Sequence, residues 1–499
     1  MKMRKTIWAL AFALLLIATA VGVQAQGQGA PSSAPSAPLP PVDSSGAGGG
    51  GKPPVAAARG VSGPSDPMSY DPSQVTPDDN TLSGAQQFGL GSLDHAHNIF
   101  DPSFSVSGLG MTSPGSAGQT NLAGVMILNG SVAFDRIWSI NHLTLVYNGG
   151  ENFTAGPVLG NTNSSHSQFH NLTFSQQMTW ARWHVLIRDD FTASPGAVFT
   201  GTGMGGPGLI AQFSSQLGST LSSFGQTFTP GETIETGNVM RYRNSILGQA
   251  EYSFSRRSAV TFAGSYGLLD FAGTGFVNSH MLDAQAGYDY LLDPTNSIAV
   301  LASYGKIDYS YLPLGASSNV NSSTTNYMAA FAYGRKITGR VAFQAEVGPE
   351  QIRVSDGTGN YAFWFVSANT ALIYNRRRSG FNFSYNRGLT AGSGVFLGST
   401  ANTFSGFGSY QFNRFLTGSV NGGYALNNSL APAGMATTSF TNWFLGANVG
   451  QRIGQHATLN FNYGLQHQDA IICPVTSCGG AGFLQTFGMT LNWHLRPTG

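Results

Sequence analysis

The end of the chain carries the clearest alternation of apolar and polar residues. From Ala457 the odd positions are apolar and the even positions are polar or small, and the pattern returns up to Leu495. A period of two predicts β-strands with one apolar and one polar face. Neither stretch contains Lys, Arg, Asp or Glu, and the polar face holds Asn, Thr, Gly and Gln. This arrangement is typical of a closed barrel whose outside faces lipid. The apolar positions are Leu459, Phe461, Tyr463, Leu465, Phe487, Met489, Leu491, Trp493 and Leu495.

The same unit of strand, tight turn, strand and longer connection repeats upstream. Seventeen strands are predicted from Leu122 onward, and the weaker stretch Ile99 to Leu109 supplies an eighteenth. Since bacterial barrels of this kind have even strand numbers, sixteen is the alternative. The stretch Ser297 to Ser310 fits the alternation only with a phase shift or bulge. Tight turns are predicted at Asp135, Arg182, Arg256, Asp293, Arg335, Arg376, Arg414 and Arg452.

The pattern therefore predicts an all-β fold, a transmembrane antiparallel up-and-down β-barrel of about 18 strands. A disordered N-terminal segment precedes it. Residues 1–25 combine basic residues, an apolar run from Ile7 to Ala20 and small residues before a cleavage point, which predicts a signal peptide. Residues 26–97 are rich in Pro, Gly and Ser, which predicts a disordered periplasmic tether, or alternatively a Pro-rich arm that binds a partner. The barrel is assigned to residues 98–499.

Composition supports a membrane barrel and argues against other classes. Charged residues make up 9% of the chain, against about 25% in ordinary soluble proteins. After the signal peptide no apolar run is long enough for a membrane-spanning helix. The net charge is +1, and no basic stripe suggests a nucleic-acid partner.

On these features the chain resembles the porin-like outer-membrane β-barrels of Gram-negative bacteria. The resemblance spans about residues 98–496 and rests on the signal peptide, alternating strands, short turns and closing apolar strand. It implies a location in the outer membrane, with outer-membrane lipid, small hydrophilic solutes and the barrel-assembly machinery as partners. One departure is that such chains usually end on an aromatic residue, whereas this chain continues through Arg496 to Gly499. The oligomeric state, a homo-oligomer included, stays open.

Catalytic and metal-binding patterns are weak. Asp94, His95 and His97 precede the barrel and lack further ligands at a fixed spacing, so neither a metal site nor a cofactor is predicted. The remaining histidines form no local signature that selects a catalytic triad, and we expect no enzyme activity. The histidines considered are His142, His166, His170, His184 and His280.

The leading function is a passive diffusion channel for small hydrophilic solutes; the alternative is a closed structural or adhesive barrel that acts through its outer loops. Strand parity assigns four positive and seven negative residues to the lumen, which predicts a weak cation preference. The alternative for these charges is internal pairing, for instance Arg243 with Glu251 or Lys306 with Asp308. The predicted lumen charges are Arg188, Asp190, Arg241, Arg243, Glu251, Asp283, Asp289, Lys306, Asp308, Glu346 and Glu350.

Two connections between strands carry further predictions. Cys473 and Cys478 lie in the last one, and because the signal peptide directs the chain to an oxidising compartment, they are predicted to form a disulfide; a metal site is the weaker alternative. The segment Ser194 to Val239 is predicted to be the longest connection. It is apolar for its length, so we expect it to fold against or into the barrel mouth, or to contact a neighbouring protomer.

Overall fold

A computed structural model describes sixteen segments of the chain. The predicted signal peptide and tether, the Asp94–His97 motif, the β5–β6 connection and both cysteines lie outside them. The described residues are 98–114, 120–155, 165–195, 240–255, 257–272, 276–293, 295–311, 320–338, 340–356, 359–376, 378–390, 397–413, 415–430, 439–454, 456–468 and 482–495.

The described residues form eighteen strands. The first nine are β1 (Asn98–Pro114), β2 (Thr120–Trp138), β3 (Asn141–Ala155), β4 (Ser165–Thr179), β5 (Trp183–Pro195), β6 (Met240–Ser253), β7 (Ser258–Phe271), β8 (Val277–Asp293) and β9 (Asn296–Tyr311). The other nine are β10 (Val320–Thr338), β11 (Val341–Asp356), β12 (Gly359–Arg376), β13 (Ser379–Thr390), β14 (Ser399–Gln411), β15 (Leu416–Ser429), β16 (Ser439–Ile453), β17 (Ala457–Gln468) and β18 (Gly482–His494).

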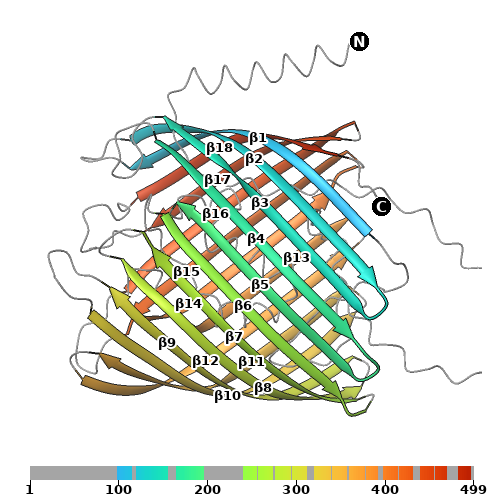
Figure 1. Cartoon of the computed structure of the whole chain (residues 1–499), viewed down its shortest axis with the longest axis vertical. Helices are drawn as coiled ribbons and strands as arrows, with labels where there is room; N and C mark the ends of the chain where they lie inside the picture. Colours follow the sequence, from blue (N-terminus) through green and yellow to red (C-terminus); the bar gives the residue numbers. More distant parts are fainter. Residues whose placement is uncertain are drawn as a thin grey trace, which may run out of the picture.

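The strands close into one antiparallel barrel, as Figure 1 shows. Each strand pairs with its neighbours in the chain, and β1 pairs with both β2 and β18. Across this closing seam the hydroxyls of Ser107 and Thr490 are hydrogen-bonded at 2.9 Å. Closure leaves no unpaired sheet edge, which a sheet in lipid requires. The predicted fold and the strand number of eighteen are confirmed, and sixteen is excluded.

Connections alternate between the two ends of the barrel, here named the turn end and the loop end; all the long ones lie at the loop end, although the β11–β12 connection there is only residues 357 and 358. Eight short turns join β2 to β3, β4 to β5 and so on to β16 and β17. Two lie further along the chain than predicted, because strand pairing continues past Asp135 to Trp138 and past Arg335 to Thr338. At the loop end, the β5–β6 connection of residues 196–239 is the longest, as predicted.

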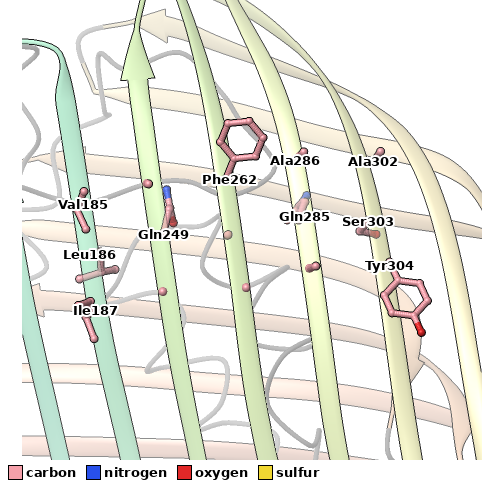
Figure 2. A pocket seen from close by; sticks show the side chains of 15 residues that line it. Val185, Leu186, Ile187, Gln249, Phe262, Gln285, Ala286, Ala302, Ser303 and Tyr304 are labelled. Carbon is pink, nitrogen blue, oxygen red and sulfur yellow. The ribbon is translucent and has the colours of Figure 1, made fainter.

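Side chains alternate between two faces with inverted polarity. Large apolar side chains are exposed on one face, such as Trp364 (70%), Val300 (60%) and Val420 (58%), whereas most side chains on the other face are polar or small and buried. Figure 2 shows this alternation across neighbouring strands: Phe262 and Tyr304 are exposed, and Gln249 and Gln285 are buried. We name these the outer and inner faces. An apolar outer face and a polar inner face give the sheet the polarity of a barrel in lipid.

Within the described residues, no helix is long and apolar enough to cross a membrane.

Candidate functional site

The inner face is the candidate site, and nine of the eleven predicted lumen charges lie on it. Arg387 of β13 also reaches this face, with its guanidinium carbon 4.7 Å from the ring centre of Phe365, which is paired with Glu350. The nine predicted charges come from β5, β6, β8 and β11. They are the arginines Arg188, Arg241 and Arg243, and the acids Asp190, Glu251, Asp283, Asp289, Glu346 and Glu350.

For Lys306 and Asp308 the lumen assignment is wrong. Lys306 is paired with Leu282, an exposed outer-face residue, and the side chains of Lys306 and Asp308 are 42% and 52% exposed. The two do form the expected ion pair, 2.8 Å long, but on the outer face. The cause is that β9 runs without a phase shift from Ser297 to Ser310, so its odd positions face inward throughout.

A basic group lies on the inner face of β5 and β6. The guanidinium of Arg188 donates to the carboxylate of Asp190 from Nε at 2.5 Å and from Nη2 at 2.8 Å. The hydroxyl of Thr173 donates to the same carboxylate at 2.9 Å. Arg188 and Asp190 neutralise each other, so Arg241 and Arg243 provide the net positive charge. The suggested pair of Arg243 with Glu251 is wrong, because the two stand eight residues apart on one strand.

An acidic group lies on the inner face of β8 and β11. Asp283 and Glu350 are 4% and 3% exposed, and the amide nitrogen of Asn326, on the intervening strand β10, donates to Glu350 Oε1 at 2.8 Å. Nearer the turn end, Asp289 and Glu346 are also buried. Acids therefore dominate this part of the wall, a few strands from the basic group.

Away from the turn end, the described inner wall from β13 through the seam to β4 is mainly polar and, Arg387 aside, uncharged. Its side chains are mainly amides and hydroxyls, such as those of Asn442, Asn460 and Thr490. Neighbouring amides bond to each other, as Asn448 does to Asn462. A wall of donors and acceptors suits contact with water and neutral hydrophilic solutes.

Near the loop end the inner face becomes apolar, which the sequence analysis missed. Val277, Met281, Ile307, Tyr309, Ile352, Val354 and Leu389 form one buried cluster, and Leu397 and Leu430 pack against it. Leu389, Leu397 and Leu430 belong to the loop-end edge of β13–β15, several strands away from β8 and β9 in the barrel. A Cβ built on Gly398 would lie 2.7 Å from the hydroxyl oxygen of Tyr309. The loop end is therefore narrowed on this side by packing of apolar side chains.

Two further apolar clusters lie on the inner face near the loop end. One joins Leu109 and Met111 of β1 to residues of β2, β4 and β18, and the other joins Leu269, Phe271 and Phe276 around the β7–β8 connection. Runs such as Ile127 and Val125 break the polar inner pattern of β2, and this is the signal that could have revealed the change.

The five histidines considered above are divided between the two faces of the barrel wall. His142 and His184 lie on inner-face positions, whereas His166, His170 and His280 lie on outer-face positions. His170 and His280 each bond a tyrosine hydroxyl, those of Tyr147 and Tyr266. In the described part of the chain, no three His, Cys, Asp or Glu side chains are grouped so that they could hold a metal ion.

No protein-family model and no curated protein matches the sequence. Solved structures similar to the model include OpdQ of Pseudomonas aeruginosa, with 8% identity over 81% of this chain and 98% of that chain and a TM-score of 0.38. OccK2 (OpdF) of Pseudomonas aeruginosa is 10% identical over 80% of this chain and 98% of that chain, with a TM-score of 0.38. BauA, the ferric preacinetobactin receptor of Acinetobacter baumannii, is 9% identical over 80% of each chain, with a TM-score of 0.41. At such identities, what this barrel can do is decided by its own residues.

Proposed function

We propose that the protein is an outer-membrane diffusion channel for small hydrophilic solutes with a weak preference for cations. The observation that carries the proposal is the inverted polarity of a closed eighteen-stranded barrel, apolar outside and polar inside. A barrel of this strand number is wide enough to hold an aqueous lumen. A polar inner wall would be unfavourable in a solvent-free core, whereas its donors and acceptors can hydrogen-bond water and hydrophilic solutes in a lumen.

The cation preference follows from the inner charges. Four arginines, Arg387 included, face six carboxylates, and one of each is paired in the Arg188–Asp190 ion pair. The remaining excess of two acids lowers the energy of a cation in the lumen relative to an anion. The preference is weak because Arg241 and Arg243 create an opposing positive region on the same wall.

The proposal includes the surroundings of the barrel. Outer-membrane lipid covers the apolar outer face, and insertion depends on the barrel-assembly machinery. The tether of residues 26–97 extends into the periplasm, and a homo-oligomer is compatible with the exposed apolar surface.

Planar-bilayer recording of the purified full-length protein tests the channel. We expect discrete conductance steps and a reversal potential on the cation side in a salt gradient. Replacing Asp283, Asp289, Glu346 and Glu350 together by Asn or Gln should move the reversal potential toward anions. The matched control is Lys306→Gln with Asp308→Asn, which changes two outer-face charges and should leave the reversal potential in place. An unshifted potential in the fourfold variant contradicts the lumen assignment.

The apolar packing at the loop end favours the second candidate, a closed structural or adhesive barrel. Leu389, Leu397 and Leu430 contact the cluster on β8 and β9 and take up space at the mouth. If the folded protein inserts into the bilayer and shows no conductance, the closed barrel replaces the channel as the better account.

A further inference from the structure

Gly305 leaves a gap on the inner face that two polar side chains fill. A Cβ at this position would lie 2.2 Å from Asn326 Oδ1 and 2.3 Å from Asp283 Oδ1. Asp283 and Asn326 are the residues paired with Gly305 on the flanking strands β8 and β10. Both side-chain oxygens therefore occupy the space that a Cβ at position 305 would take.

The two oxygens that meet there are both acceptors. Asn326 donates its amide nitrogen to Glu350 Oε1 at 2.8 Å, and this bond turns its carbonyl oxygen Oδ1 toward Asp283. An amide carbonyl and an ionised carboxylate cannot hydrogen-bond each other, because neither carries a hydrogen. A cation between them would convert the unfavourable approach into two favourable contacts.

Two buried oxygens, one of Asp283 and one of its neighbour on β7, lack hydrogen-bond partners in the part of the chain that the structure describes. Asp283 is 4% exposed, and among the described residues its Oδ2 has no hydrogen-bond partner. Ser265, paired with Asp283 on β7, is 5% exposed, and its hydroxyl has no partner within the described segments either. Lys306 is adjacent in sequence, but it faces outward and pairs with Asp308. A buried carboxylate without a counter-charge is costly, so this group of oxygens is suited to a bound positive ion.

We propose that Asp283, Asn326 and Ser265 form a binding site for a hard cation, with Ca²⁺ as the ion that fits the ligand chemistry. The Asp283 carboxylate and Asn326 Oδ1 are the main ligands, and the Ser265 hydroxyl is a third. Glu350 acts as a positioning residue by fixing the orientation of the Asn326 amide, and its charge adds to the attraction. Carboxylate, amide carbonyl and hydroxyl oxygens are the ligands that Ca²⁺ takes in proteins. The site does not depend on whether the barrel conducts.

Calcium titration of the refolded full-length protein in non-ionic detergent tests the site, because refolded protein carries no bacterial lipid that binds Ca²⁺ itself. Isothermal titration should show one saturable Ca²⁺ per chain, with a Kd on the order of 10⁻⁴–10⁻³ M. Asp283→Asn should abolish this binding by removing the charged ligand. Gly305→Ala should abolish it without changing any charge, because the new Cβ forces the two oxygens apart.

Two matched variants act as controls. Gly248→Ala adds a methyl group at a strand glycine whose Cβ meets nothing within 4 Å. Asp289→Asn removes another buried acid from the inner face of β8, six residues from Asp283. Both should keep the Ca²⁺ binding of the natural chain, and circular dichroism checks that every variant is folded.

The proposal is overturned if the natural chain binds no Ca²⁺ at about 10 mM, ten times the weak end of the range for extracellular sites. Unchanged binding in folded Asp283→Asn or Gly305→Ala also overturns it. Because the titration needs no conductance, calcium binding and channel activity succeed or fail separately.

Discussion

A charge on the outer face of β15 should lower the free energy of unfolding far more than the same charge on the inner face one residue away. Val420 is 58% exposed, and its outer-face neighbours on β14 and β16 are Gly408 and Ala447, which offer no polar partner. Exposed aromatic side chains bracket it, with Phe415 toward the turn end and Tyr424 toward the loop end. Aromatic girdles mark the two membrane interfaces, so Val420 lies near the middle of the apolar band.

Val420→Arg should therefore destabilise the folded barrel by about 2–4 kcal/mol, the cost of a basic side chain at the bilayer midplane. Such a loss lowers the folding equilibrium constant about 30-fold to about 1,000-fold. Urea titration of folding into lipid vesicles, followed by tryptophan fluorescence, measures the change.

The matched control is Asn421→Arg on the same strand. Its side chain faces inward, opposite Gly446, which leaves room for a longer side chain. This variant should lose less stability than Val420→Arg, because its guanidinium stays on the polar inner face and does not enter the hydrocarbon. Equal losses for the two variants, or a larger loss for Asn421→Arg, would refute the assignment of inner and outer faces.

Two further predictions concern the ends of the barrel. At the β8–β9 turn, hydrogen bonds from the Thr295 and Asn296 side chains and the Thr295 backbone lower the pKa of Asp293 from 3.8 to about 2. The carboxylate therefore stabilises the turn above pH 3.8 and loses this effect as the pH falls through about 2. Asp293→Asn should lower the urea midpoint at pH 7 and have no effect below pH 2, and equal effects at both pH values would contradict the turn geometry. At the loop end, Cys473 and Cys478 should be joined by a disulfide. Mass spectrometry of the non-reduced protein should find no free thiol, and detection of two free thiols would reject the bond.

Barrel class and strand polarity follow from the sequence alone, whereas the choice between sixteen and eighteen strands needed the structure. Alternation of period two is a local property of the sequence. In lipid, strands must close into a barrel so that every backbone N–H and C=O group is hydrogen-bonded, so the pattern in β17 and β18 already implies the barrel. The weak stretch Ile99 to Leu109 could be recognised as a strand because closure with an even number required one more. For the same reason most inner charges, such as Asp289 and Glu346, could be read from parity.

Only the tertiary structure decided the features that depend on how strands pair with one another. The parity of β9 is set by its pairing with β8 and β10, and this placed Lys306 and Asp308 outside although their own strand allowed either face. The loop-end apolar cluster joins strands far apart in the sheet, so no local pattern predicts it. Asp283, Gly305 and Asn326 lie on three different strands, and only the register of those strands brings their atoms together. Alternation determines which face a side chain occupies, whereas contact between side chains depends on backbone pairing over long sequence separations.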